Sequence, residues 1–288
     1  MSRDAGPAEE PAFAPTGFDA LPPPAMARKA EDVGVAKATM ATASLFALAV
    51  LAGAFIALGA LFATTAMAGG GELPYGVQRL LGGVTFSLGL ILVVVAGAEL
   101  FTGNNLVVMA WASGRVATGR LLAGWAVVYA GNFVGAVATA ALVYAGRQHD
   151  FGGGAVGEQA LAIAEAKLGL GFLLAVALGV LCNALVCLAV WLTYSARTTT
   201  DRILAVVPPI AAFVAAGFEH SVANMYFIPF ALLVERDAGF AADGELGWGA
   251  FLLDNLVPVT IGNVLGGAVM VGAVYWFVYL RPARGPGS

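Results

Sequence analysis

The chain has 288 residues, of which 60% are apolar and only 11% are charged, a composition typical of an integral membrane protein rather than a soluble domain. A net charge of −4 offers no basic surface, which excludes nucleic acid as a partner. Cys182 and Cys187 lie five positions apart in one apolar run without His or Cys partners, so neither a disulfide framework nor a zinc site is predicted. We expect no metal and no cofactor.

The first 37 residues differ from the rest of the chain. They mix acids, bases and prolines, and they lack the apolar stretch of a cleavable signal peptide. We expect residues 1–37 to form a Pro-rich tail that is largely disordered, with some helical character near Met26 to Lys37. Residues 38–281 are predicted to form the transmembrane domain, and residues 282–288 a short C-terminal tail.

Stretches without charge show which segments can cross a bilayer, because a charged side chain is costly in hydrocarbon. A spanning helix needs about 20 apolar residues. Four uninterrupted stretches meet this length: residues 38–71, 121–146, 168–196 and 255–280. Two further stretches, residues 80–114 and 203–234, are each interrupted by a single glutamate, Glu99 or Glu219. The sequence therefore predicts an all-α fold with six transmembrane helices, of which the second and fifth are broken.

The order whole, broken, whole occurs twice, which predicts two inverted three-helix repeats. Short sequence echoes support the repeat: Glu99-Leu-Phe-Thr-Gly-Asn104 resembles Glu219-His-Ser-Val-Ala-Asn224, and Gly131-Asn-Phe-Val-Gly135 resembles Gly262-Asn-Val-Leu-Gly266. With six spans both termini lie on one side. Ten of the 14 Lys and Arg residues fall on that side, which predicts that both termini are cytoplasmic.

The two broken segments contain polar residues where a membrane protein rarely tolerates them. A break frees backbone N–H and C=O groups that protein or cavity water must satisfy. Each break also points the N-terminus of a half-helix at the bilayer centre, and its partial positive charge favours an anion. His220 lies beside Glu219 at the second break, and intramembrane histidines often belong to proton relays or substrate paths. The alternative is a histidine satisfied in the core. His149, in a glycine-rich loop, is expected to be solvated.

Two polar residues of the fourth predicted span allow two interpretations each. Lys167 is either a snorkelling lysine at the interface or part of a substrate path. Asn183 lies near mid-span, where an amide needs polar partners, and it either joins helices together or belongs to the path.

Six motifs together resemble the formate/nitrite transporter family from about Lys37 to Arg281. They are Phe86-Ser-Leu-Gly-Leu90, Ala98-Glu-Leu-Phe-Thr-Gly103, Gly131-Asn-Phe-Val-Gly135, Cys182-Asn-Ala-Leu-Val-Cys-Leu-Ala-Val-Trp191, Gly217-Phe-Glu-His-Ser-Val-Ala-Asn-Met225 and Asn255-Leu-Val-Pro-Val-Thr-Ile-Gly-Asn263. The resemblance implies an aquaporin-like channel monomer, a homopentamer with one pore per protomer, and a location in the bacterial cytoplasmic membrane.

The resemblance also implies roles for individual residues. Thr102 and His220 are expected to face each other across the pore from the two breaks. Lys167, Asn183 and Glu219 match a polar group in the outer vestibule that attracts the anion and couples to the histidine. The residues expected to form apolar constrictions on either side of the central chamber are Phe86, Leu90, Phe101, Val186 and Phe213.

The predicted function is transport of small monovalent anions of weak acids, with proton-coupled neutralisation at His220. Gly103 stands where formate channels carry serine, which leaves formate, nitrite and hydrosulfide all open as substrates. A water or glycerol channel is disfavoured because the sequence contains no Asn-Pro-Ala. A membrane enzyme that uses Glu219 and His220 as acid and base is the alternative from another class, but neighbouring residues point apart on a helix.

Overall fold

The computed structural model describes residues 20–71, 73–237, 239–242 and 246–281, and every regular element within them is helical, as predicted. The elements in chain order are α1 (Pro23–Ala38), α2 (Thr42–Met67), α3 (Tyr75–Ala96), the 3₁₀ helix η1 (Gly103–Val107), α4 (Val108–Ala112), α5 (Thr118–Ala145), the 3₁₀ helix η2 (Gln148–Asp150), α6 (Ala155–Leu168), α7 (Phe172–Ser195), α8 (Thr199–Ala215), α9 (Ser221–Val234), the π-helical η3 (Ala250–Leu256), α10 (Val257–Val264), the π-helical η4 (Leu265–Ala273) and α11 (Val274–Tyr279).

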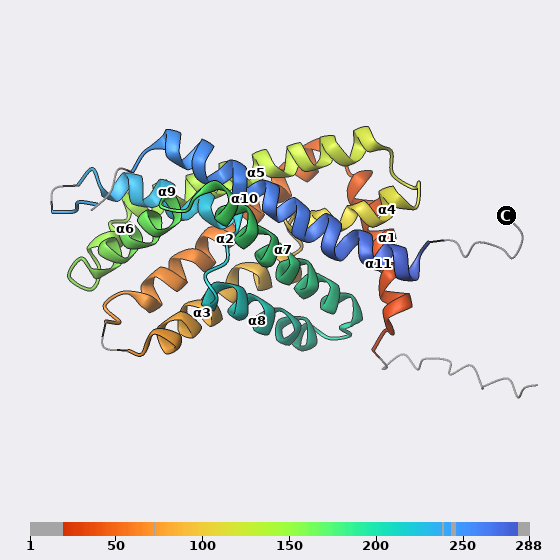
Figure 1. Ribbon diagram of the computed structural model, residues 1–288, viewed down its shortest axis with the longest axis horizontal. Coiled ribbons are helices and arrows are strands. Elements are labelled where there is room, and N and C mark those ends of the chain that lie inside the picture. Colours follow the sequence, from red (N-terminus) through yellow and green to blue (C-terminus); the bar gives the residue numbers. More distant parts are fainter. Residues whose placement is uncertain (1–19, 72, 238, 243–245, 282–288) are drawn as a thin grey trace, which may run out of the picture.

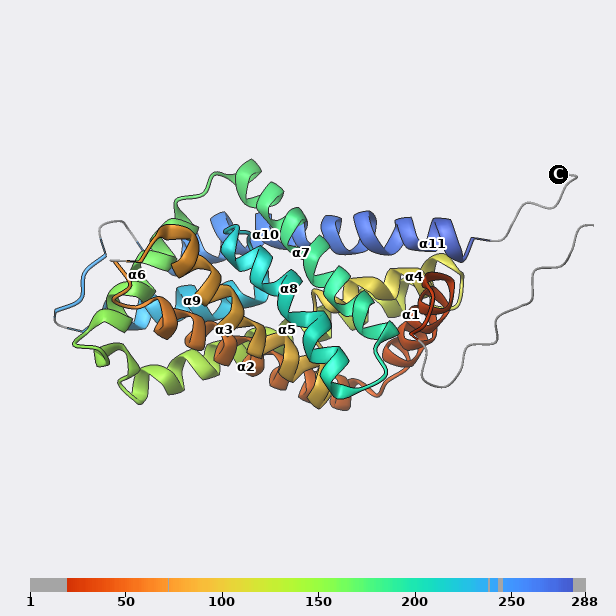
Figure 2. The ribbon, with the colours of Figure 1, turned by 90° about the horizontal axis from the view of Figure 1, so that it is seen from below.

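Five helical segments of the described chain are long and apolar enough to cross a membrane. They are α2, α3, α5, α7 and the continuous segment Ala250–Tyr279, which runs along one side of the molecule in Figure 2. α8 and α9 have 17 and 14 residues, so neither reaches the length of a span by itself. Together they cover the interval assigned to the broken fifth helix, and the count of six spans stays a prediction.

Both predicted breaks are present, and a glycine ends the first half-helix of each. α3 is followed by Gly97 at φ 82°, and α8 is followed within two residues by Gly217 at φ 76°. Left-handed backbone of this kind is costly for residues with a Cβ atom. The glycines therefore let each chain leave its helix and turn into the loop that carries the polar motif.

All of α1 except its last residue, Ala38, lies in the segment that the sequence assigns to the tail, and the helix includes the range Met26 to Lys37 where helical character is expected. It buries Met26, Ala27, Ala30 and Gly34, and its apolar face belongs to a cluster with Met109 and Trp191. α6 holds the corresponding place before α7, and α1 and α6 lie at opposite ends of the molecule (Figures 1 and 2). Each repeat unit thus begins with a helix shorter than a span. Residues 1–19 lie outside the described residues.

Glycines allow the unbroken helices of each unit to approach closely. A Cβ atom at Gly135 of α5 would lie 1.9 Å from the carbonyl oxygen of Val50 in α2. In the second unit, a Cβ atom at Gly266 would lie 2.1 Å from the carbonyl oxygen of Val180 in α7. Small residues bring membrane helices together in this way because lipid provides no hydrophobic force between them. The repeated glycine motif in the sequence therefore marks the same close helix contact in each of the two units.

His149 is fully buried, so the expectation that it is solvated is wrong. Its ring stacks on Tyr144 at 5.2 Å and meets the edge of Phe240 at 5.6 Å between centroids. Nε2 lies 2.8 Å from Oδ2 of Asp237, and the Tyr144 hydroxyl donates to Oδ1 at 2.7 Å. Hydrogen bonds from Tyr144 and His149 hold the pKa of Asp237 below its ordinary value. The glycine-rich loop folds back onto the chain that follows α9, and this burial is not visible in local sequence.

We predict that Gly135→Ala destabilises the protein by about 1–3 kcal/mol, because the added methyl group forces α5 away from α2. Gly124→Ala in the same helix is the matched control, since nothing lies within 4 Å of its Cβ position. The measurement is the melting temperature of both variants in detergent. Equal melting of Gly135→Ala and Gly124→Ala would contradict the close contact.

Candidate functional site

An asparagine on α5 fastens the first break. Asn132 donates from Nδ2 to the carbonyl oxygens of Ala49 at 2.7 Å and Glu99 at 2.9 Å, and its Oδ1 accepts from the Phe101 backbone N–H at 2.8 Å. The Glu99 N–H donates to the carbonyl oxygen of Leu48 at 3.2 Å. Backbone groups that leave the helix pattern are thus paired without water.

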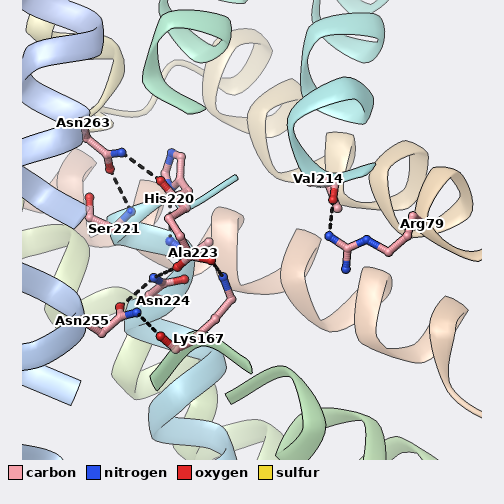
Figure 3. A network of polar contacts seen from close by, with 10 residues as sticks. Arg79, Lys167, Val214, His220, Ser221, Ala223, Asn224, Asn255 and Asn263 are labelled. Atoms are coloured by element: carbon pink, nitrogen blue, oxygen red, sulfur yellow. Dashed lines mark hydrogen bonds and ion pairs between the residues drawn. The ribbon is translucent and has the colours of Figure 1, made fainter. Parts of the chain in front are cut away.

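The second break is fastened in the same way by Asn263 of α10, which Figure 3 shows beside His220 and Ser221. Asn263 Nδ2 donates to the carbonyl oxygens of Gly179 and Glu219, both at 2.9 Å, and its Oδ1 accepts from the Ser221 N–H at 2.9 Å. The Glu219 N–H donates to the carbonyl oxygen of Leu178 at 3.3 Å. The two units therefore repeat one set of contacts, which supports the predicted internal repeat.

Each break also carries a buried glutamate paired with a lysine and an asparagine. At the first break, Lys37 Nζ lies 2.7 Å from Glu99 Oε2 and 2.8 Å from Asn104 Oδ1, and Asn104 donates to the same carboxylate at 2.8 Å. The Glu99 side chain is only 8% exposed, so the lysine and amide replace the water that would otherwise stabilise its charge.

At the second break, Lys167 Nζ lies 2.8 Å from Glu219 Oε1, and Asn224 donates to Glu219 Oε2 at 2.7 Å. Asn224 also donates to Asn255 Oδ1 at 2.8 Å, and Asn255 donates to the carbonyl oxygen of Lys167 at 3.0 Å. Figure 3 shows this chain of contacts directly below His220. Lys167 is held by the carboxylate and is not a free snorkelling lysine.

Thr102 and His220 meet between the two breaks, as the resemblance predicts. Thr102 Oγ1 lies 3.0 Å from His220 Nε2, and both residues are buried. His220 caps α9 through Nδ1, which accepts the backbone N–H of Ala223 at 3.1 Å. Because Nδ1 is an acceptor, the neutral ring carries its proton on Nε2 and donates to the threonine. Phe213 stacks on the imidazole at 5.9 Å between centroids.

Two cavities of about 300 Å³ each lie on either side of this pair. The α1 vestibule, defined as the cavity beside α1, is lined by Lys29, Lys37, Leu90, Glu99 and Arg202 among others. The α6 vestibule, defined as the cavity beside α6, is lined by Phe86, Lys167, Phe213, Glu219 and His220 among others.

Some of the residues expected to form constrictions line one of the two vestibules, and others line neither. Phe86 and Phe213 meet edge to face at 5.5 Å between centroids, beside the α6 vestibule. Leu90 faces the α1 vestibule, whereas Phe101 packs on Tyr129 at 4.9 Å. Phe101 and Val186 are buried and line neither cavity. Their role as constrictions stays a prediction.

Asn183 does not join Lys167 and Glu219. Its Nδ2 lies 2.9 Å from Asn105 Oδ1, 2.6 Å from the carbonyl oxygen of Asn263 and 3.3 Å from that of Thr102. The amide therefore ties the first break to α10, which matches the interpretation of Asn183 as a residue that joins helices.

Sequence reasoning missed several members of the site: Lys37, Asn104, Asn132, Asn224, Asn255 and Asn263. The internal repeat contained the signal for most of them. Lys167 follows Lys37 by 130 residues, as Gly179 follows Ala49, and Asn224 follows Asn104 by the same 120 residues that separate Glu219 from Glu99. The repeat therefore extends beyond the spans to the charged residues that precede them.

Comparison with known proteins identifies the family. A family model described as formate/nitrite transporter matches residues 24–277. The chain belongs to the formate/nitrite transporter family. It is 45% identical over 274 residues to the formate channel FocA of Escherichia coli strain K12, covering 92% of this chain and 96% of that one. It is 39% identical over 265 residues to FocA of Haemophilus influenzae, covering 88% and 93% of the two chains.

Solved structures give the same answer. A structure described as a pentameric formate channel with formate bound is 44% identical, with a TM-score of 0.79 over 83% of this chain and 98% of that chain. A structure described as an FNT family ion channel is 29% identical, with a TM-score of 0.77 over 88% and 98%. Both FocA relatives are named as formate channels, and family membership makes this chain a multi-pass membrane transporter rather than an enzyme.

We predict that Asn132→Leu lowers stability by about 1–3 kcal/mol for each backbone group that loses its partner in the first break. Thr139→Val is the control on the same helix, because the Thr139 hydroxyl donates only to the carbonyl oxygen of Gly135 in its own helix. Melting temperatures in detergent provide the comparison. If Asn132→Leu and Thr139→Val have the same melting temperature, the Asn132 amide does not stabilise the break.

Proposed function

We propose that this protein is a channel for formate, and for nitrite as a second small anion, in the bacterial cytoplasmic membrane. The observation that carries the proposal is the buried contact between Thr102 and His220, which lies between two vestibules that each contain a lysine. The similar proteins named as formate channels support formate as the substrate. α1 and α11 lie at the same end of the molecule in Figure 1, which supports two termini on the same side, and the excess of Lys and Arg supports the cytoplasm as that side.

We also propose a homopentamer with one pore in each protomer. The related structure described as pentameric supports this assembly. Many large apolar side chains are exposed on the outer helices, among them Phe62, Leu142, Leu173, Leu253 and Phe277. Lipid and neighbouring copies of the chain would cover such a surface in a membrane.

The apolar surroundings of His220 set the energetic problem that transport must solve. An anion that sheds its water there meets an idealised penalty of order 20 kcal/mol and an effective one of several. Neutralising a carboxylic acid with a pKa of about 4 requires only about 4 kcal/mol at pH 7. Crossing as the neutral acid is therefore the cheaper route between Phe86 and Leu90.

The two vestibules begin this route and His220 completes it. Lys37 and Lys167 draw the anion from water to either mouth. At the centre, His220 Nε2–H donates to Thr102 in the absence of substrate. When the anion arrives, the same N–H donates to an oxygen of the anion and stabilises it. Loss of that proton alone would leave an imidazolate, so His220 passes its Nε2 proton to the anion only as Nε2 receives another proton from vestibule water. The net change is one proton moved from vestibule water to the anion, with the imidazole neutral before and after.

We predict that His220→Phe lowers formate uptake into liposomes at least tenfold and flattens its dependence on pH, because the ring can neither donate nor relay. His220→Gln is the matched variant, since its amide still donates a hydrogen bond but does not titrate. We expect His220→Gln to retain part of the flux without the pH profile. An unaltered rate and pH profile in His220→Phe would exclude the relay, and competition between formate, nitrite and hydrosulfide would rank the substrates.

A further inference from the structure

The α1 vestibule contains more positive charge than a monovalent anion requires. Lys29, Lys37 and Arg202 line it, and the carboxylate among its lining residues is Glu99. That carboxylate is paired with Lys37 at 2.7 Å. Neither Lys29 nor Arg202 forms an ion pair with a carboxylate of the described residues. Among the described residues, Lys29 and Arg202 therefore line this cavity without a carboxylate partner of their own.

The internal repeat shows that Lys29 has no charged counterpart in the second unit. The α6 vestibule has the matching pair, Lys167 and Glu219, and its arginine is Arg79. Arg79 is engaged with the carbonyl oxygens of Val214 and Ala215 at the end of α8. Lys37 and Lys167 are 130 residues apart. At the same spacing, the counterpart of Lys29 is the uncharged Gln159. The surplus charge therefore belongs to one mouth and is not needed by the repeated pathway.

Lys29 is held in position rather than free to swing into water. Its Nζ donates to the carbonyl oxygen of Tyr194, near the end of α7, at 2.8 Å, which leaves two N–H groups for another acceptor. Burial, followed by the nearby charges of Arg202 and Arg197, lowers the pKa of Lys29. A bound anion would relieve this repulsion between like charges.

We propose that the α1 vestibule binds a small polyvalent oxyanion of the phosphate type, held by Lys29, Lys37 and Arg202. A volume of about 300 Å³ suits an ion of this size. Arginine and lysine together favour phosphate oxygens through charge-assisted hydrogen bonds. A bound polyanion covers the entrance on the Lys37 side and slows uptake of the monovalent substrate, whereas the α6 vestibule lacks the third cation.

The test is calorimetric titration of the purified full-length protein with inorganic pyrophosphate at constant ionic strength. Lys29→Gln introduces the residue that the second unit has at this position, and it is expected to weaken binding about tenfold, equivalent to about 1.4 kcal/mol. Arg28→Gln, an exposed neighbour on the same helix that does not line the cavity, is the control and is expected to bind like the parent. Orthophosphate distinguishes a general phosphate site from one that needs a diphosphate.

Absence of binding heat beyond a chloride control, or equal affinity in the parent and Lys29→Gln, would overturn the proposal. Formate uptake measured without pyrophosphate reports separately on the proposed channel function. In liposomes of uniform orientation, pyrophosphate is expected to inhibit from the α1 side alone. Inhibition from both sides, or from the α6 side alone, would contradict the assignment to this vestibule.

Discussion

A membrane interior solvates neither an unpaired backbone amide nor a charge, and the whole site follows from this constraint. The two helix breaks survive because Asn132 and Asn263 each pair three backbone groups with a single amide side chain. One amide can satisfy both a donor and two acceptors, which a hydroxyl of similar size cannot do with fixed geometry. With the breaks held in this way, two loops meet at the centre, where one contributes Thr102 and the other His220.

The same constraint explains where charge is found. Glu99 and Glu219 are buried, but each lies at a vestibule with its lysine, so the ion pairs remain beside water. Removing one partner of such a pair would leave an uncompensated buried charge and is strongly destabilising. The centre, by contrast, holds the neutral contact between Thr102 and His220. Charged mouths and an uncharged centre are the profile that the proposed capture of an anion and passage of its neutral acid would require.

Much of this arrangement was predictable from sequence, because hydropathy and repeated motifs are local properties. The charge-free stretches located the broken segments, and the family resemblance brought together Thr102, His220, Lys167 and Glu219. Helical character near Met26 to Lys37 was expected, but the charge-free stretches gave no sign that α1 packs against the bundle, since a short helix with several charges has the composition of a tail. Partners of Asn183 and burial of His149 depend on loops that return from distant parts of the chain, and no local pattern contains that information.

The central claim is that the imidazole between the vestibules rests uncharged with its proton on Nε2. Nitrogen-15 NMR of labelled protein in lipid tests this directly, with a His149→Gln variant used to assign the two histidine signals. The account predicts one protonated and one unprotonated ring nitrogen for His220 at neutral pH, and a changed Nε2 signal when formate is added. Two protonated ring nitrogens at neutral pH would contradict it.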